Sequence, residues 1–62
     1  MEKITIDRFK INMKPVTFNN PHGWTEEQIL ELLADLKKNF HAAFNIQCMA
    51  IADIIQRSPP ND

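Results

Sequence analysis

The residues best suited to metal chemistry are His41, Asn45 and Cys48, which share one side of a helix if residues 25–57 are helical. Positions i, i+4 and i+7 lie within roughly 60° of one another on a helix, so these side chains could form half of a metal site between two chains. The sequence has no Cys-x-x-Cys or His-x-x-x-His pair, the spacing typical of zinc sites. We therefore expect a partly exposed imidazole, a thiol packed as a small hydrophobe, no metal and no cofactor.

Three carboxylates, Glu27, Glu31 and Asp35, follow one another at intervals of one helical turn. A pair of carboxylates can act as general acid and base only if an apolar surrounding shifts one pKa, and nothing in the sequence implies such a surrounding. A solvated helix face is the expected interpretation, and docking of this acidic face on a basic partner is the alternative. We expect the protein not to be an enzyme.

Basic residues cluster near the N-terminus, where residues 1–14 contain four Lys or Arg against two Asp or Glu, and residues 15–62 contain three against six. If the segment is a strand, its polar side carries Thr5 and Asn12 together with the candidate nucleic-acid contacts Lys3, Arg8, Lys10 and Lys14. Two such strands paired across a dimer would form a basic ribbon of the kind that enters the DNA major groove. A dimeric DNA-binding regulator is therefore the alternative function.

The start of the helical region is marked by Trp24, Thr25 and Gln28. The Thr25 hydroxyl and the Gln28 side chain have the spacing of a capping box, and Trp24 and Ile29 have that of a hydrophobic staple. An exposed Trp24 anchoring an interface is the alternative, because tryptophan is enriched at binding hot spots. The region ends at residue 57, because Ser58 precedes a proline, and residues 58–62 are predicted to be a frayed tail.

An apolar stripe follows one side of residues 25–57 when each residue is turned by 100°. It is the predicted core or oligomer interface: Ile29, Leu32, Leu33, Leu36, Phe40, Ala43, Phe44, Gln47, Ala50, Ile51 and Ile54. Because its phase is continuous, we predict one long helix of about 50 Å, with a kink allowed near Asn39–Asn45. A helical hairpin broken in that window is the alternative. Gln47 either sets the register between helices or faces solvent at a bend.

The segment before the helix, residues 1–24, is predicted to be an extended arm and turn. Ile4 and Ile6 alternate with polar residues, and Phe9 and Ile11 continue on the opposite parity, which predicts a bulge near residues 7–8. The segment contains no Asn-Gly turn. We expect either a strand that pairs with a partner chain or an irregular arm lying on the helices.

The composition sets the class of protein. The chain has 62 residues, 44% of them hydrophobic, a net charge of −1 and one cysteine, so no internal disulfide can form. No apolar run reaches the ~18 residues of a membrane helix, and a single cysteine suits the cytoplasm. We predict a single small domain, 1–62, that is mainly α and packs as a dimer or higher oligomer, because so short a chain has little core of its own. The expected function is binding of an unidentified protein as modulator, adaptor or inhibitor.

Overall fold

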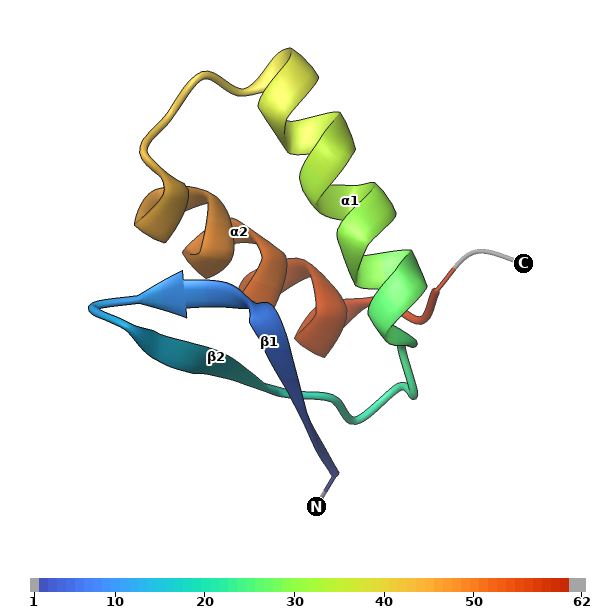
Figure 1. The fold of residues 1–62 in the computed structure, drawn as a ribbon. Helices are drawn as coiled ribbons and strands as arrows, with labels where there is room; N and C mark the ends of the chain where they lie inside the picture. Colours follow the sequence, from blue (N-terminus) through green and yellow to red (C-terminus); the bar gives the residue numbers. More distant parts are fainter. Residues whose placement is uncertain (1, 61–62) are drawn as a thin grey trace.

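The computed structural model describes residues 2–60, which form an antiparallel hairpin followed by two helices (Figure 1). Strands β1 (Lys3–Ile11) and β2 (Lys14–Asn19) precede helices α1 (Glu26–Asn39) and α2 (Phe44–Arg57). The fold is therefore α+β, and the prediction of a mainly α protein with one long helix is wrong. Of the predicted tail, residues 58–60 follow α2 and residues 61–62 lie outside the described part.

The hairpin has one buried, apolar face and one polar face, and an irregularity in β1 makes this arrangement possible. Ile6 lies opposite Val16 and Lys10 lies opposite Pro15, so residues 7–9 have no partners on β2. This interruption confirms the predicted bulge. It brings Phe9, which is on the opposite parity to Ile6, onto the same buried face. The other face is polar, and across it the hydroxyl oxygens of Thr5 and Thr17 are 2.9 Å apart.

The strands are joined by a two-residue turn, Asn12 and Met13, whose φ angles are 54° and 66°. Two positive φ values in succession match the type I′ turn, whose twist suits a hairpin. Asparagine tolerates this region well, but methionine does not, so the sequence carries only half of the usual signal. The expectation that the strand pairs with another chain or forms an irregular arm is corrected, because β1 pairs with β2 of the same chain.

Replacement of Met13 by glycine is expected to stabilise the protein by about 1 kcal/mol, because glycine adopts a positive φ without strain. Met13 is 91% exposed, so little packing is lost. Urea unfolding of Met13→Gly and of the control Met13→Ala measures the effect. The glycine variant should be the more stable of the two, and equal stabilities would show that the turn stores no strain.

Helix α1 begins as the sequence predicts. The Thr25 backbone N–H donates to Gln28 Oε1 at 2.9 Å, and the Gln28 backbone N–H donates to Thr25 Oγ1 at 3.2 Å, which completes the capping box. Two glutamates in the first turn and two lysines in the last turn complement the helix dipole. The C-terminal end is closed by Asn39, whose side-chain amide donates to the Asp35 carbonyl at 3.1 Å.

Residues 40–43 separate α1 from α2, inside the Asn39–Asn45 window of the alternative prediction. A four-residue break is close to one helical turn of 3.6 residues, so the apolar stripe keeps its phase across it. The continuous phase of the apolar stripe is therefore compatible with two helices, and the prediction of a single helix from it was wrong. The molecule's longest extent is 26 Å, half of what the long helix would need, and its radius of gyration, 10.9 Å, is near the roughly 10.6 Å of a compact chain of this length.

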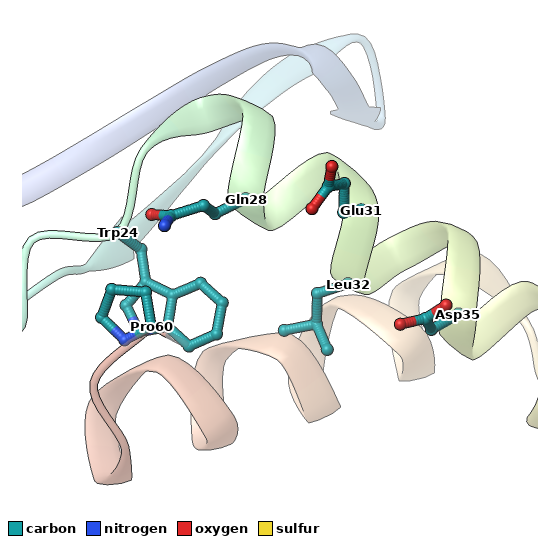
Figure 2. A pocket seen from close by; sticks show the side chains of 6 residues that line it. All are labelled: Trp24, Gln28, Glu31, Leu32, Asp35 and Pro60. Atoms are coloured by element: carbon teal, nitrogen blue, oxygen red, sulfur yellow. The ribbon is translucent and has the colours of Figure 1, made fainter. Parts of the chain in front are cut away.

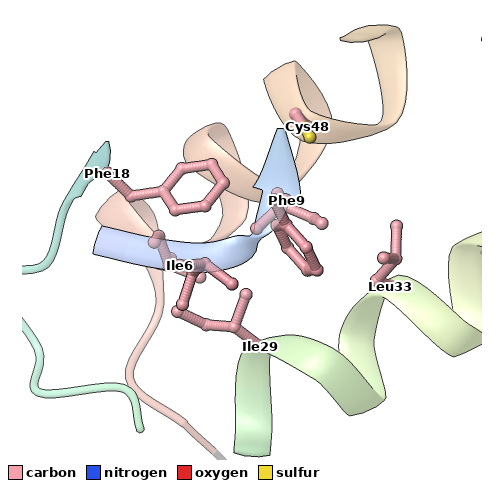
Figure 3. Close-up of a cluster of buried hydrophobic side chains, with 8 residues drawn as sticks. Ile6, Phe9, Phe18, Ile29, Leu33 and Cys48 are labelled. Carbon is pink, nitrogen blue, oxygen red and sulfur yellow. The ribbon is translucent and has the colours of Figure 1, made fainter. Parts of the chain in front are cut away.

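The core lies between the hairpin and the two helices and draws on all four elements (Figure 3). Phe9 is at its centre, with edge-to-face contacts to Phe18 and Phe44 at ring-centroid distances of 6.4 and 5.6 Å. The largest fully buried side chains in the described part of the chain are Ile6, Ile29, Ile51 and Ile55. The chain therefore has a core of its own, to which the stripe residues Ile29, Leu33 and Ile51 belong, and packing of the stripe between chains stays a prediction.

Candidate functional site

An apolar groove of about 280 Å³ runs between β2 and α2. None of its lining residues is charged at neutral pH; they are Ile11, Val16, Thr17, Phe18, Asn45, Cys48, Met49 and Ala52. On α2 the lining residues follow the i, i+3, i+4, i+7 spacing of a single helix face. This face lies away from the α2 residues that belong to the predicted stripe.

The groove is bordered by the outer edge of β2. Successive side chains of a strand point to opposite faces, yet three consecutive β2 residues, Val16, Thr17 and Phe18, line the groove. The strand must therefore present its edge there. Within residues 2–60 the sheet has only the two strands β1 and β2, so the other edge of β2 has no strand beside it. An unpaired edge offers backbone N–H and C=O groups to another extended chain.

Methionine exposure marks the α2 side of this groove. The Met49 side chain is 67% exposed, whereas its neighbour Cys48 is buried and only 4% exposed. Burial raises the pKa of the Cys48 thiol above its ordinary value, so the thiol stays neutral and unreactive at physiological pH. Flexible, polarizable methionine side chains are common at protein-binding surfaces. Sequence reasoning did not find the groove; its only signal was apolar residues of α2 that lie off the stripe.

A second hollow, of about 150 Å³, lies between α1 and the segment that follows α2 (Figure 2). Its lining combines apolar surface, one amide and two carboxylates: Trp24, Gln28, Glu31, Leu32, Asp35 and Pro60. Two of the three carboxylates predicted to share a face of the helix are thus brought to one pocket. Glu27 is exposed outside it.

The position of Trp24 is set by Asn20, a residue that sequence reasoning missed. Asn20 is 6% exposed, and its side chain both donates to the Trp24 carbonyl and accepts from the Trp24 backbone N–H, each at 2.8 Å. The indole N–H of Trp24 donates to the Ser58 carbonyl at 2.8 Å. Trp24 also packs against the core cluster that contains Ile29, and the staple contact between these two side chains stays a prediction. The turn itself was predicted, but the only signal for the role of the Asn20 side chain was that an asparagine precedes a proline.

The proposed metal half-site does not assemble. His41 lies in the linker at residues 40–43, whereas Asn45 and Cys48 lie on α2, so the helical spacing on which the idea rested is absent. Asn45 is exposed and Cys48 is buried. In the described part of the chain, no three His, Cys, Asp or Glu side chains are grouped so that they could hold a metal ion.

The residues of the predicted stripe separate into three groups. Ile29, Leu33, Gln47 and Ile51 are buried; Leu32, Leu36, Phe44, Ala50 and Ile54 are half-buried; and Phe40 and Ala43 are exposed in the linker. Gln47 is buried, so the interpretation that it faces solvent at a bend is wrong. Its side-chain amide donates to the Phe40 carbonyl at 3.1 Å and holds the linker between the helices.

The four basic candidates are all exposed on the hairpin. Lys3, Arg8 and Lys10 belong to β1 and Lys14 begins β2, so a ribbon formed by equivalent strands of two chains is replaced by a hairpin within one chain. Arg8 is directed to α1, with its Nε 3.9 Å from a carboxylate oxygen of Glu26. Nucleic-acid binding through these residues stays a prediction.

Neither described helix is long and apolar enough to cross a membrane. Comparisons of the chain with protein-family models, curated proteins and solved structures find no match.

Proposed function

We propose that this chain is a small non-enzymatic protein that binds another protein, acting as modulator, adaptor or inhibitor, and that the β2–α2 groove is its binding site. The occupant we infer is an extended, apolar segment of the partner that lies along the free edge of β2. The observation that supports this most directly is the coincidence of an uncharged groove, an unpaired strand edge and the exposed Met49 side chain.

The chemistry of the groove favours a peptide over a small substrate. Its volume of about 280 Å³ is just below the ~300–1,000 Å³ range of small-molecule sites and suits one or two apolar side chains. Backbone hydrogen bonds to β2 would supply affinity, and alternate side chains of the partner would enter the groove against α2, as in strand addition to other sheets. No lining residue is a credible general base, because Cys48 is buried with a raised pKa.

The proposal includes a homo-oligomer, but only one whose copies contact each other through the β2–α2 groove. Much of the stripe no longer requires a second chain, because Ile29, Leu33 and Ile51 lie in the chain's own core and Leu32, Leu36 and Phe44 pack against it. A second copy would instead have to place its own segment in the β2–α2 groove. Sedimentation analysis distinguishes the two occupants, because self-association through the groove should be lost in a groove variant.

The test is a peptide selection from a displayed random library, followed by affinity measurements on Met49→Lys. We expect selected peptides with alternating apolar residues, and at least about tenfold weaker binding to the variant, because the ligand would have to desolvate an unpaired ammonium. Met49 is exposed and lysine matches methionine in helix propensity, so the variant should fold.

The matched control is Ile46→Lys, which adds the same charge to the same helix at a site 42% exposed and outside the groove. Binding to this control should be nearly unchanged. Methylating alternate backbone nitrogens of the selected peptide should also weaken binding if the β2 edge accepts it as a strand. The proposal fails if no peptide is selected, if Met49→Lys binds the peptide with unchanged affinity, or if both lysine variants lose affinity equally.

A further inference from the structure

The pocket beside Trp24 differs from the β2–α2 groove because it combines apolar surface with charged side chains. Its inner surface is apolar, from the Trp24 indole, Leu32 and Pro60, whereas Glu31 and Asp35 place carboxylates at its rim (Figure 2). This surface lies on α1, apart from the β2–α2 groove, and no groove residue contributes to it.

The two rim carboxylates have no counter-ion in the part of the chain that the structure describes. The ion pairs there are Arg8 with Glu26 and Arg57 with Asp53. Glu31 and Asp35 are one helical turn apart, a spacing at which like charges repel each other and destabilise a helix. A bound cation would relieve this repulsion, so the charge pattern favours a positive ligand.

The pocket is held in shape before any ligand arrives. Asn20 fixes the Trp24 backbone through two hydrogen bonds of 2.8 Å, and the Ser58 carbonyl fixes the indole N–H at 2.8 Å. The Gln28 amide oxygen already accepts from the Thr25 N–H. The ring is therefore positioned at no cost to the ligand, which is the condition for a site that can recognise a single side chain.

Size and lining narrow the choice of cation. A volume of about 150 Å³ is half the lower limit of small-molecule sites, but is enough for one side chain. Two carboxylates are too few oxygens for calcium, which takes 6–8. An arginine side chain fits every feature, because its methylene stem can cover the apolar surface, its guanidinium can stack on the indole, and its fork of donors matches a carboxylate.

We propose that the Trp24 pocket binds an arginine side chain of a basic segment in a partner protein. Glu31 and Asp35 accept hydrogen bonds from the guanidinium, and the face of Trp24 supplies the cation–π contact. This site gives the acidic face of α1 a specific ligand, and it does not depend on the β2–α2 groove.

The probe is a capped pentapeptide with one arginine between glycines, compared with the same peptide carrying citrulline, the uncharged isostere of arginine, or lysine. Trp24 is the only tryptophan in the chain, so its fluorescence reports occupancy of the pocket directly. We expect a saturable change with the arginine peptide, weaker binding of the lysine peptide and none of the citrulline peptide.

The pocket variant is Glu31→Gln with Asp35→Asn, which keeps shape and removes both charges. It should bind the arginine peptide about tenfold more weakly or worse, the loss expected for charge-assisted hydrogen bonds. The matched control, Glu2→Gln with Asp7→Asn, makes the same change in net charge at exposed residues outside the pocket. It should bind like the unaltered protein.

The proposal is overturned by any of four results: no saturable change with the arginine peptide, equal binding of the citrulline peptide, tighter binding of the lysine peptide, or equal losses in the two double variants. Circular dichroism of both variants should match that of the unaltered protein, because all four side chains are exposed. Peptides selected on the β2–α2 groove serve as a second control, since their binding should be unaffected by the pocket variant.

Discussion

Replacing Phe9 with alanine is expected to lower the free energy of unfolding by about 3–5 kcal/mol. Phe9 is 3% exposed and contacts Phe18 and Phe44 edge-to-face, so it joins both strands of the hairpin to α2. A chain of this length has a total stability of roughly 3–9 kcal/mol. The variant should therefore lose a third or more of its stability, and unfold at room temperature if the total lies in the lower half of that range, in contrast to the small effect that a free N-terminal arm would predict.

Circular dichroism with urea titration measures this loss. Phe40→Ala is the matched control, because it makes the same chemical change at a side chain that is 40% exposed in the linker. The control substitution should lower the free energy of unfolding by less than about 1 kcal/mol. If Phe9→Ala were as stable as Phe40→Ala, the hairpin would not be part of the core.

Replacing Asn20 with alanine is expected to cost about 2–3 kcal/mol, because it leaves the backbone N–H and carbonyl of Trp24 without their partners. Those two hydrogen bonds close the turn that links the hairpin to α1. Loss of the turn should also release the Trp24 ring, so its fluorescence should shift toward that of a solvated indole. The expected arginine site would weaken at the same time.

Asn19→Ala is the natural comparison, since Asn19 is an exposed neighbour of the same residue type. Its unfolding free energy should change by less than about 0.5 kcal/mol. Equal stabilities of the two variants would mean that water replaces the Asn20 side chain, and that the turn is held by its backbone alone.

The features that sequence reasoning found are those with local causes. The capping box needs only two side chains three residues apart, and the bulge follows from a change in parity between Ile6 and Phe9. Both act within a few residues, so no tertiary information is needed to see them. The acidic face of α1 was also visible, but its pocket was not, because Trp24 and Pro60 reach it from different elements.

The errors occurred where local signals were weak or absent. Helix α2 begins at Phe44 with no side-chain cap, since its N-cap residue is Ala43. The hairpin turn places Met13 at a positive φ, where glycine is the usual residue. In both places the local sequence does not favour the observed conformation, and long-range packing of Phe9 against Phe18 and Phe44 stabilises it.

The sequence by itself determined where α1 begins, which strand residues change parity and which residues are apolar, because those properties belong to single residues and near neighbours. Only the tertiary structure decided that the stripe folds on its own hairpin. The four-residue linker conserves the helical phase, so one helix and two helices produce the same pattern of apolar residues. The two arrangements differ only in the direction of the chain after Asn39, which depends on what α2 packs against. The packing of α2 against the hairpin and α1 also created both hollows that are proposed as binding sites.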